Sequence, residues 1–255
     1  MLSGYTLYLE MMSNKVQIVY SSKDENPKEI HDYFSLEAKA MEKVGFIIGS
    51  IPNDNANVLI YRGFAMYSRG DYPKDIRYIQ GEKEYLSTMQ LSLYYPLIKD
   101  LSIPTFFVKE LNDEIQSKMD ELGWERVFIK NDVKSLKNVG AMASVYPDNT
   151  LTNIKDNLNQ YPVYEFYAIR KYLNPDFFKE EDRYWVLNGK VFFRKNNVPP
   201  IVREAARRLN CLGSKYYVID ATPDVVVEVN PGEGADRYGA NSPELFAKWF
   251  KKAFL

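Results

Sequence analysis

The chain has 255 residues, of which 45% are hydrophobic and 26% are charged, with 33 Lys and Arg against 34 Asp and Glu. This composition indicates a globular protein and excludes long disordered regions. The formal net charge of −1 argues against a general nucleic-acid binder, because binding to backbone phosphates requires clustered Lys and Arg.

Cysteine content and hydropathy indicate in which cellular compartment the protein lies. The only cysteine, Cys211, excludes an intrachain disulfide framework and fits a reducing compartment. It follows a helix-like stretch in an apolar setting, so we expect a buried, small hydrophobic residue. Residues 1–10 lack the basic region and apolar run of a secretory signal, and no stretch approaches the roughly 18 apolar residues of a membrane span. We expect a cytoplasmic protein that has no membrane partner.

The chain has a single histidine, His31, which follows the apparent start of a helix at Asn26–Glu29. We expect it to be a surface residue. A Ser–His–Asp or Cys–His site would have to use His31, yet no G-x-S-x-G context accompanies it, and too few His and Cys are present for a zinc site. The chemistry must therefore rest on Lys, Arg and carboxylates.

The first part of the chain predicts a small α/β lobe. Apolar and β-branched runs typical of strands, and a stretch of helical periodicity, occur in the order strand, helix, strand, strand. This order favours a mostly parallel sheet. The predicted segments are the strands Lys15–Tyr20, Phe46–Ser50 and Asn57–Arg62 and the helix Phe34–Val44, which ends at Gly45.

The middle of the chain alternates helical and extended patterns and ends in a polar loop that bears lysines and reaches Gly140. The predicted segments are the helix Leu86–Leu101, the strand Pro104–Val108, the helix Asn112–Leu122 closed by Gly123, and the strand Arg126–Lys130.

From Tyr161 onward the pattern predicts antiparallel strands. Asn188-Gly189 marks a hairpin turn, because Asn-Gly readily adopts the positive φ of a type I′ turn. Ser242 followed by Pro243 predicts the capped start of a last helix. The predicted segments are the strands Val163–Arg170, Tyr184–Leu187 and Lys190–Arg194, the helix Pro199–Leu212, a hairpin of Tyr216–Asp220 and Val225–Val229 over Ala221–Asp224, and the helix Ser242–Phe254.

The last predicted hairpin carries polar side chains within apolar strands. Glu228 and Asn230 are two residues apart and project from the same face of the sheet, which Asp220 can reach from the neighbouring strand. A carboxylate among the apolar residues around Glu228 carries a desolvation cost unless a cation compensates it. An exposed sheet face would also hold such residues singly. We favour a site of hard oxygen ligands for Mg²⁺ that bridges phosphates.

A second segment can supply positive charge. The strand that ends at Lys130 continues into a loop with Lys134 and Ser135, and lysine ammonium groups suit phosphate oxygens. The loop is not a P-loop, because G-x-x-x-x-G-K-[ST] is absent. A solvated lysine-rich loop is the common alternative, and the acidic segment downstream favours the phosphate interpretation.

Several arginines stand at strand ends. Arg62, Arg170 and Arg194 end predicted strands and Arg183 precedes one; in an α/β sheet the carboxyl end of a strand faces the crevice where ligands usually bind. Each arginine could equally form a surface ion pair, which we favour for Arg194.

In this order of residues the chain resembles the ATP-grasp superfamily, and more narrowly the clade named for one arginine and two lysines. The resemblance covers nearly the whole chain after residue 15. Its most specific part is the Glu-x-Asn-Pro-Gly ending, and Lys-x-x-x-Lys-Ser points to the clade. The residues that carry it are Ile60–Met66, Phe128–Ser135, Arg170, Glu181–Arg183, Asp220 and Glu228–Gly232.

The resemblance implies an ATP-grasp fold of α/β and α+β parts: an N-terminal Rossmann-like (pre-ATP-grasp) lobe, residues 1–103, and an ATP-grasp domain, residues 104–255, with subdomains 104–162 and 163–255. It implies that ATP phosphates contact Lys130, Lys134 and Ser135, that adenine lies near 164–167, and that Mg²⁺ binds to the acidic site. By the same resemblance, catalytic roles fall to Arg170, Arg183 and Lys134, adenine contacts to Glu165, Phe166 and Tyr167, metal binding to Asp220, Glu228 and Asn230, and a grip on the second substrate's carboxylate to Arg62.

Two features depart from the superfamily pattern. The link from Asp220 to Glu228 is shorter than usual, which leaves Asp224 as an alternative metal ligand. No lysine occupies the usual earlier position, before the strand that begins near Ile103-Pro104.

The implied activity is that of a Mg-ATP-dependent ligase that joins a carboxylate to an amine, or to a thiol, through an acyl-phosphate with release of ADP and phosphate. The substrate is open among amino acids, peptides and proteins, and the oligomeric state is also open. The alternatives are a phosphotransferase on the same fold and a nucleotide-binding module without turnover.

Overall fold

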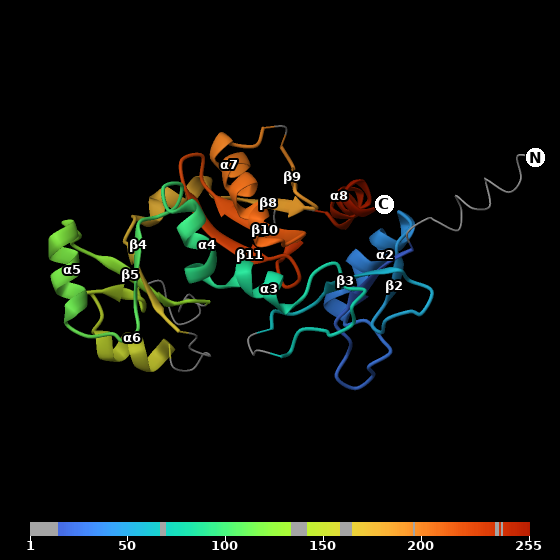
Figure 1. The fold of residues 1–255 in the computed structure, drawn as a ribbon, viewed down its shortest axis with the longest axis horizontal. Coiled ribbons are helices and arrows are strands. Elements are labelled where there is room, and N and C mark those ends of the chain that lie inside the picture. Colours follow the sequence, from blue (N-terminus) through green and yellow to red (C-terminus); the bar gives the residue numbers. More distant parts are fainter. Residues whose placement is uncertain are drawn as a thin grey trace, which may run out of the picture.

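The computed structural model describes residues 15–66, 70–133, 142–158, 165–195, 197–237, 240 and 242–255. Within these ranges the strands form three sheets. Figure 1 shows the sheet of the last four strands between the other two along the long axis of the molecule. In the same part of the chain, no helix is both long and apolar enough to cross a bilayer.

The N-terminal sheet has the strand order β2-β1-β3 and is parallel throughout, which confirms the predicted α/β lobe. All five residues of the central strand β1 are buried, as expected of a strand with neighbours on both edges. The helix α2 follows a short 3-10 turn, η1, and packs against the last helix. The bounds are β1 Val16–Tyr20, η1 Asp32–Phe34, α2 Ser35–Lys43, β2 Ile47–Gly49 and β3 Val58–Arg62.

The prediction of a single helix over Leu86–Leu101 is wrong. The chain forms two helices, α3 (Glu82–Met89) and α4 (Leu91–Ile98), with Gln90 extended between them at φ −88° and ψ 118°. The cause lies in a distant residue, Asp132, whose carboxylate accepts the backbone N–H of Ser92 (2.7 Å) and its hydroxyl (2.6 Å). This side chain satisfies orphan donors at the start of α4, so the helix begins anew there.

The middle sheet is antiparallel with the order β4-β7-β5-β6. One face carries Val127, Ile129 and Ile169, which form a core with the inner sides of α5 and α6. α5 ends at Gly123 in the left-handed conformation (φ 64°), as predicted. The bounds are β4 Thr105–Val108, α5 Glu114–Leu122, β5 Val127–Asn131, β6 Val145–Tyr146, α6 Leu151–Leu158 and β7 Tyr167–Lys171.

The strand predicted over Val163–Arg170 is therefore β7, and it pairs with β4 and β5 rather than with the strands that follow it. Residues 163 and 164 lie outside the described part. The segment that links the middle sheet to the third sheet begins after Lys171. We propose that the first ATP-grasp subdomain extends through this residue; the boundary at 103 stays a prediction.

The third sheet is antiparallel with the order β11-β10-β8-β9, and both predicted hairpins are confirmed. Asn188 (φ 47°) and Gly189 (φ 74°) make the turn between β8 and β9 with the positive φ values of a type I′ turn. Ser242 caps α8 by accepting the N–H of Leu245 (3.1 Å). The bounds are η3 Pro175–Glu180, β8 Asp182–Leu187, β9 Lys190–Phe192, α7 Pro200–Leu209, η4 Asn210–Leu212, β10 Tyr216–Ala221, β11 Val226–Pro231 and α8 Pro243–Phe254.

The two faces of the third sheet belong to different cores. Tyr184, Val186 and Ile219 pack with α4 and α7, whereas Trp185 and Val218 pack with α8 and the N-terminal sheet. The sheet is also joined to the chain just before β4: Val226 donates its N–H to Leu101 (2.7 Å), and the hydroxyl of Ser102 donates to the carbonyl of Val226 (2.9 Å).

One single-residue expectation needs correction. Cys211, expected to be buried, is exposed in η4. The chain leaves the α-helix at Leu209, so the apolar stripe of α7 no longer decides which side chains turn inward. His31 is partly exposed, in line with the surface position expected of it, and its Nδ1 accepts the N–H of Tyr33 (3.2 Å) at the start of η1.

The close packing around Gly232 gives a testable prediction. A Cβ at this position would overlap the ring of Tyr216, which is 1% exposed. We expect Gly232→Ala to lower the free energy of unfolding by about 1–3 kcal/mol, the usual cost of overpacking a core. Gly81→Ala is the control, because its Cβ would meet only Glu84 at 3.4 Å. Urea unfolding measures both; equal losses would contradict the steric explanation.

Candidate functional site

Lys130 and Glu228 meet across the space between the middle and third sheets. The ammonium group of Lys130 on β5 donates to the carboxylate of Glu228 on β11. The Lys130 side chain is 4% exposed and that of Glu228 is 24% exposed. The sequence predicted that a positive group from the mid-chain segment and a negative one from the last hairpin lie together, and for this pair the prediction of proximity is confirmed.

The predicted acidic residues form one cluster on the third sheet. Asp220 on β10 lies directly opposite Glu228 in the register of the sheet. The amide nitrogen of Asn230 is 3.4 Å from an oxygen of each carboxylate. Arg183 on β8 is in register with Asp220 and donates to both of its oxygens at 2.8 Å. All four side chains therefore project from one face of the sheet.

The donor chemistry of this cluster fits Mg²⁺, because two carboxylates and an amide oxygen are hard oxygen ligands. Within the described ranges, no three His, Cys, Asp or Glu side chains gather as a metal cluster, so the amide is needed to complete a third protein ligand. Asp224, the alternative ligand, is exposed in the turn between β10 and β11. Asp220 is the carboxylate that lies beside Glu228.

A cavity of about 330 Å³ adjoins the Lys130–Glu228 pair and is walled by both sheets. Arg170 on β7 lines it and is 6% exposed. Its Nη2 donates to the carbonyl of Val227 on β11 (2.8 Å), while its Nε is buried without a hydrogen-bond partner. A buried donor left unpaired is costly, so this wall fits a ligand with acceptor atoms. The remaining lining residues are Ile103, Phe128, Lys130, Met142, Lys171, Tyr172, Leu173, Pro175, Phe178, Glu181, Val227 and Glu228.

The residues expected at adenine lie on β7 or directly before it. Tyr167 packs in the core on the opposite face of the middle sheet, Glu165 is exposed, and Phe166 is half-buried. None of the three lines the cavity, part of whose wall is made by residues 171–173, at the end of β7 and directly after it. The adenine contacts stay a prediction. Lys134 and Ser135, expected at the phosphates, lie outside the described residues.

A smaller cavity of about 230 Å³ lies beyond the acidic cluster and is lined by Arg183, Glu228 and Asn230. Arg183 therefore stands between Asp220 and this cavity. Burial alone would lower the pKa of Arg183, but the hydrogen bonds and charge of Asp220 raise it overall. The guanidinium is fully charged at this end of the cleft. Arg194 forms the surface ion pair that we favoured, 2.7 Å from Asp182.

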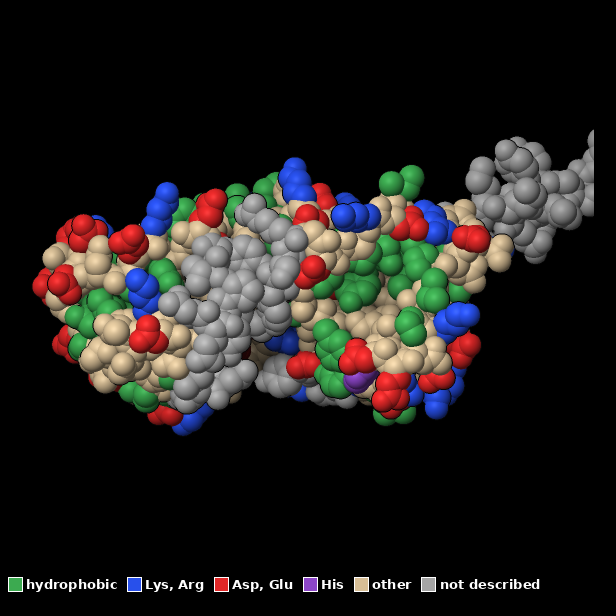
Figure 2. All heavy atoms as spheres, turned by 90° about the horizontal axis from the view of Figure 1, so that it is seen from below, with side chains coloured by type: hydrophobic (Ala, Val, Ile, Leu, Met, Phe, Trp, Pro, Cys, Tyr) green, Lys and Arg blue, Asp and Glu red, His purple; other side chains and the backbone are tan. Residues whose placement is uncertain are grey.

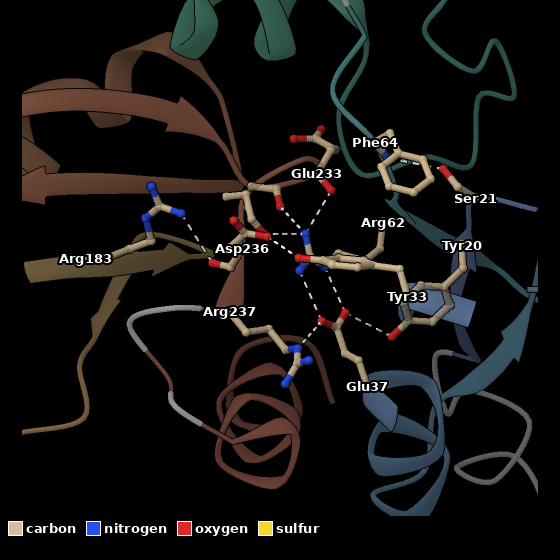
Figure 3. Close-up of polar contacts among 12 residues, drawn as sticks. Tyr20, Ser21, Tyr33, Glu37, Arg62, Phe64, Arg183, Glu233, Asp236 and Arg237 are labelled. Carbon is tan, nitrogen blue, oxygen red and sulfur yellow. Dashed lines mark hydrogen bonds and ion pairs between the residues drawn. The ribbon is translucent and has the colours of Figure 1, made fainter. Parts of the chain in front are cut away.

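Arg62 has partners other than the substrate carboxylate that the sequence predicted. Figure 3 shows it at the centre of a buried network. It is 2% exposed; its Nε and Nη2 donate to the two oxygens of Glu37 (2.8 and 3.1 Å). Its Nη1 donates to the carbonyls of Gly232, Glu233 and Ala235 at 3.2, 3.0 and 2.6 Å. The structure thus uses Arg62 to tie the N-terminal sheet to the segment that follows Asn230.

The network explains the charge state of Arg62. Burial would lower its pKa, and the carboxylate of Glu37 outweighs burial, so the pKa is raised. Arg237 also donates to Glu37 (3.0 Å), and the Tyr20 hydroxyl donates at 3.2 Å. Glu37 is 1% exposed. A carboxylate at that depth is stable only with such partners.

Glu233 is a second buried carboxyl that sequence reasoning missed. It is 0% exposed, and one oxygen accepts from the Tyr72 hydroxyl (2.9 Å) and from the Gln80 amide. Its other oxygen has no partner. Burial raises its pKa to about 7. The sequence feature that could have identified it is its position between Gly232 and Gly234, directly after the Glu-x-Asn-Pro-Gly ending.

Removal of the Arg62 guanidinium tests the buried network. We expect Arg62→Met to lower the free energy of unfolding by about 3–5 kcal/mol, because the Glu37 carboxylate loses its main partner. Glu37→Gln in the same chain should recover part of this loss. Arg207→Met, which removes an ion pair whose arginine is 71% exposed, should leave the free energy of unfolding nearly unchanged. Urea unfolding of the variants decides; similar losses for Arg62→Met and Arg207→Met would contradict the prediction.

The raised pKa of Glu233 predicts a pH-dependent stability. As the pH rises from the ordinary value of 4.5 to about 7, the unfolded chain releases a proton that the folded chain retains. Folding is therefore disfavoured progressively over this window, by about 1.4 kcal/mol per pH unit. We expect Glu233→Gln to gain stability over the wild type across the same window, and a matched change at the exposed Glu110 to leave the profile unchanged. A constant difference between Glu233→Gln and wild type from pH 4 to 8 would exclude this behaviour.

No family model matches the chain, and no curated protein matches its sequence. Solved structures that are similar include D-cycloserine synthetase DcsG (TM-score 0.60, 12% identity, covering 93% of this chain and 99% of that chain). The ATP-grasp ligase PsnB, solved with precursor peptide PsnA2 and AMPPNP, has a TM-score of 0.58 at 10% identity and covers 94% and 97%. The macrocyclase MdnC from Microcystis aeruginosa MRC, solved with precursor peptide MdnA, has a TM-score of 0.57 at 12% identity and covers 92% and 99%. The chain has the ATP-grasp fold.

Proposed function

We propose that the protein is a Mg-ATP-dependent ligase that joins a carboxylate to an amine through an acyl-phosphate. The observation that carries this proposal is the meeting of Lys130 with Glu228, Asp220 and Asn230 at the edge of a cavity between two sheets. The solved structures that share the fold include named ligases and synthetases. The clade named for one arginine and two lysines remains part of the proposal.

The nucleotide would occupy the cavity of about 330 Å³, whose lining is mostly apolar near residues 171–173. An apolar slot with a few polar groups suits a purine base. Lys130 and the unpaired Nε of Arg170 stand where phosphate oxygens would emerge from that slot. Lys134 and Ser135 follow β5 in the sequence, and we propose that they also contact the phosphates.

Asp220, Glu228 and Asn230 would hold Mg²⁺, which when bound neutralises charge on the transferring phosphoryl group. Lys130 and Arg183 now neutralise these two carboxylates. With metal and triphosphate present, the ammonium and guanidinium groups would turn to phosphate oxygens while the carboxylates turn to the metal. The two carboxylates would then balance the charge of the metal, and Lys130 and Arg183 would offset part of the charge of the triphosphate.

The remaining chemistry requires positioning rather than a nucleophilic side chain. Arg183 reaches the cavity of about 230 Å³ beyond the acidic cluster, where a substrate carboxylate would accept the γ-phosphoryl group. Arg170 and Arg183 would stabilise negative charge on the phosphoryl group in the transition state. An amine then displaces phosphate from the acyl-phosphate. PsnB and MdnC were solved with precursor peptides, so peptides stand beside amino acids and proteins as candidate substrates.

Substitution of Glu228 tests the proposal. With pooled amino acids and peptides, the wild-type protein should release ADP and phosphate and form a new amide. Glu228→Gln keeps the shape of the side chain but removes the charge, and we expect turnover to fall on the order of 100-fold to 1000-fold, the effect of several kcal/mol of lost transition-state stabilisation. Asp224→Asn, at an exposed turn, should leave turnover unchanged. Mass spectrometry of products and an ADP assay provide the measurement.

Other products would identify the alternatives. AMP with pyrophosphate would contradict the acyl-phosphate route, and a stable phosphorylated product with no amide would indicate a phosphotransferase. Tight ATP binding that is indifferent to Mg²⁺, without turnover, would indicate a nucleotide-binding module.

A further inference from the structure

A third cavity, of about 410 Å³, opens on the N-terminal sheet side of the site and has an aromatic wall. Tyr33, Phe34 and Phe64 line it, with the rings of Phe34 and Phe64 5.3 Å apart and those of Tyr33 and Phe64 6.1 Å apart. His31 meets the Phe64 ring edge-on at 5.0 Å. The wall is thus a preformed, packed surface rather than a set of loose side chains.

Much of this apolar surface faces solvent. The exposed fractions are 54% for Tyr33 and 49% for Phe64, and nearby Leu36 is 67% exposed. In the space-filling view of Figure 2, hydrophobic side chains gather beside acidic ones on the half of the molecule that holds the N-terminal sheet. A contiguous exposed apolar surface next to a cavity is typical of a binding site.

The charge that the cavity presents is negative. Asp236 lines it and is exposed; its carboxylate accepts from the hydroxyl of Tyr33. Arg183 donates to the backbone carbonyl of Asp236 at 3.4 Å rather than to its carboxylate. Arg62 also lines the cavity but is 2% exposed and donates to Glu37 and three carbonyls. The accessible charged group of this cavity is therefore the negative carboxylate of Asp236. The expected group was the positive guanidinium of Arg62, as a partner for a substrate carboxylate.

This cavity lies next to the one at the acidic cluster. Both are lined by Ala65, Gly234, Ala235 and Asp236. The backbone passes closely at this shared wall, since a Cβ on Gly234 would lie 2.9 Å from the Cα of Ala65. Asp236 therefore borders both cavities, and Arg183, Glu228 and Asn230 line the second one.

We propose that the aromatic cavity binds the amine-bearing co-substrate, with its apolar or aromatic body on Phe64 and Tyr33 and its ammonium group at Asp236. The inference rests on the proposed ligase function, in which the amine must approach the activated carboxylate near Arg183. Rings attract a cation through their faces, and the Asp236 carboxylate adds a direct charge partner. A co-substrate that presents a carboxylate at this position would be repelled.

Three probes of similar shape test the charge preference: 2-phenylethylamine, 2-phenylethanol and 3-phenylpropionate, titrated into the full chain and followed by ligand-observed saturation-transfer NMR. We expect the amine to bind about threefold to tenfold more tightly than the other two, a difference on the order of 1 kcal/mol. Asp236→Asn keeps an acceptor for Tyr33 and should abolish the preference. Phe64→Ala should weaken all three probes, and Asp224→Asn should change none.

Equal binding of the three probes, tighter binding of the acid, no binding of the amine, or a preference that survives Asp236→Asn would each overturn the inference. Calorimetric titration of Mg-ATP into the wild-type chain separates this result from the fate of the proposed function. If Mg-ATP binds and the amine is not preferred, only the co-substrate assignment fails. If the amine is preferred through Asp236 but Mg-ATP does not bind, the amine site stands and the ligase proposal fails.

Discussion

The arrangement of the cleft depends on one buried ion pair, between Arg62 and Glu37. Both side chains are almost fully excluded from solvent, and a charge at that depth persists only when it is paired and hydrogen-bonded. The guanidinium meets this requirement with Glu37 on one side and the carbonyls of 232, 233 and 235 on the other. The segment after Asn230 is thereby fixed to the N-terminal sheet, and with it Gly234, Ala235 and Asp236, which line both the cavity of about 230 Å³ and the one of about 410 Å³.

In the cleft, the acidic side chains of the third sheet are paired with basic side chains. Each of the two carboxylates in the acidic cluster has a basic partner, Lys130 for Glu228 and Arg183 for Asp220. The two partners come from different places: Lys130 crosses from the middle sheet, whereas Arg183 lies on the adjacent strand. Both carboxylates of the acidic cluster are therefore neutralised by cations of the chain itself.

The sequence predicted the features that depend on residues close to one another in the chain. Alternating apolar residues located the strands, Asn188-Gly189 located a hairpin turn, and the common face of Glu228 and Asn230 followed from the period of a strand. The sequence did not predict contacts between residues that lie far apart in the chain. The break at Gln90 depends on Asp132, forty residues after Ser92. The partners of Arg62 come from α2 and from the segment after β11, and the buried state of Glu233 depends on Tyr72 and Gln80.

The bond between Asp132 and Ser92 has a mechanical consequence. It fixes the end of β5 to α4, which packs on the third sheet. A second attachment joins Leu101 and Ser102, just before β4, to Val226 on the third sheet. Together with the contacts of Lys130 with Glu228 and of Arg170 with Val227, these attachments hold the middle sheet to the third sheet from both ends of its central strands. A separation of the two sheets would have to break polar contacts at several points along the cleft.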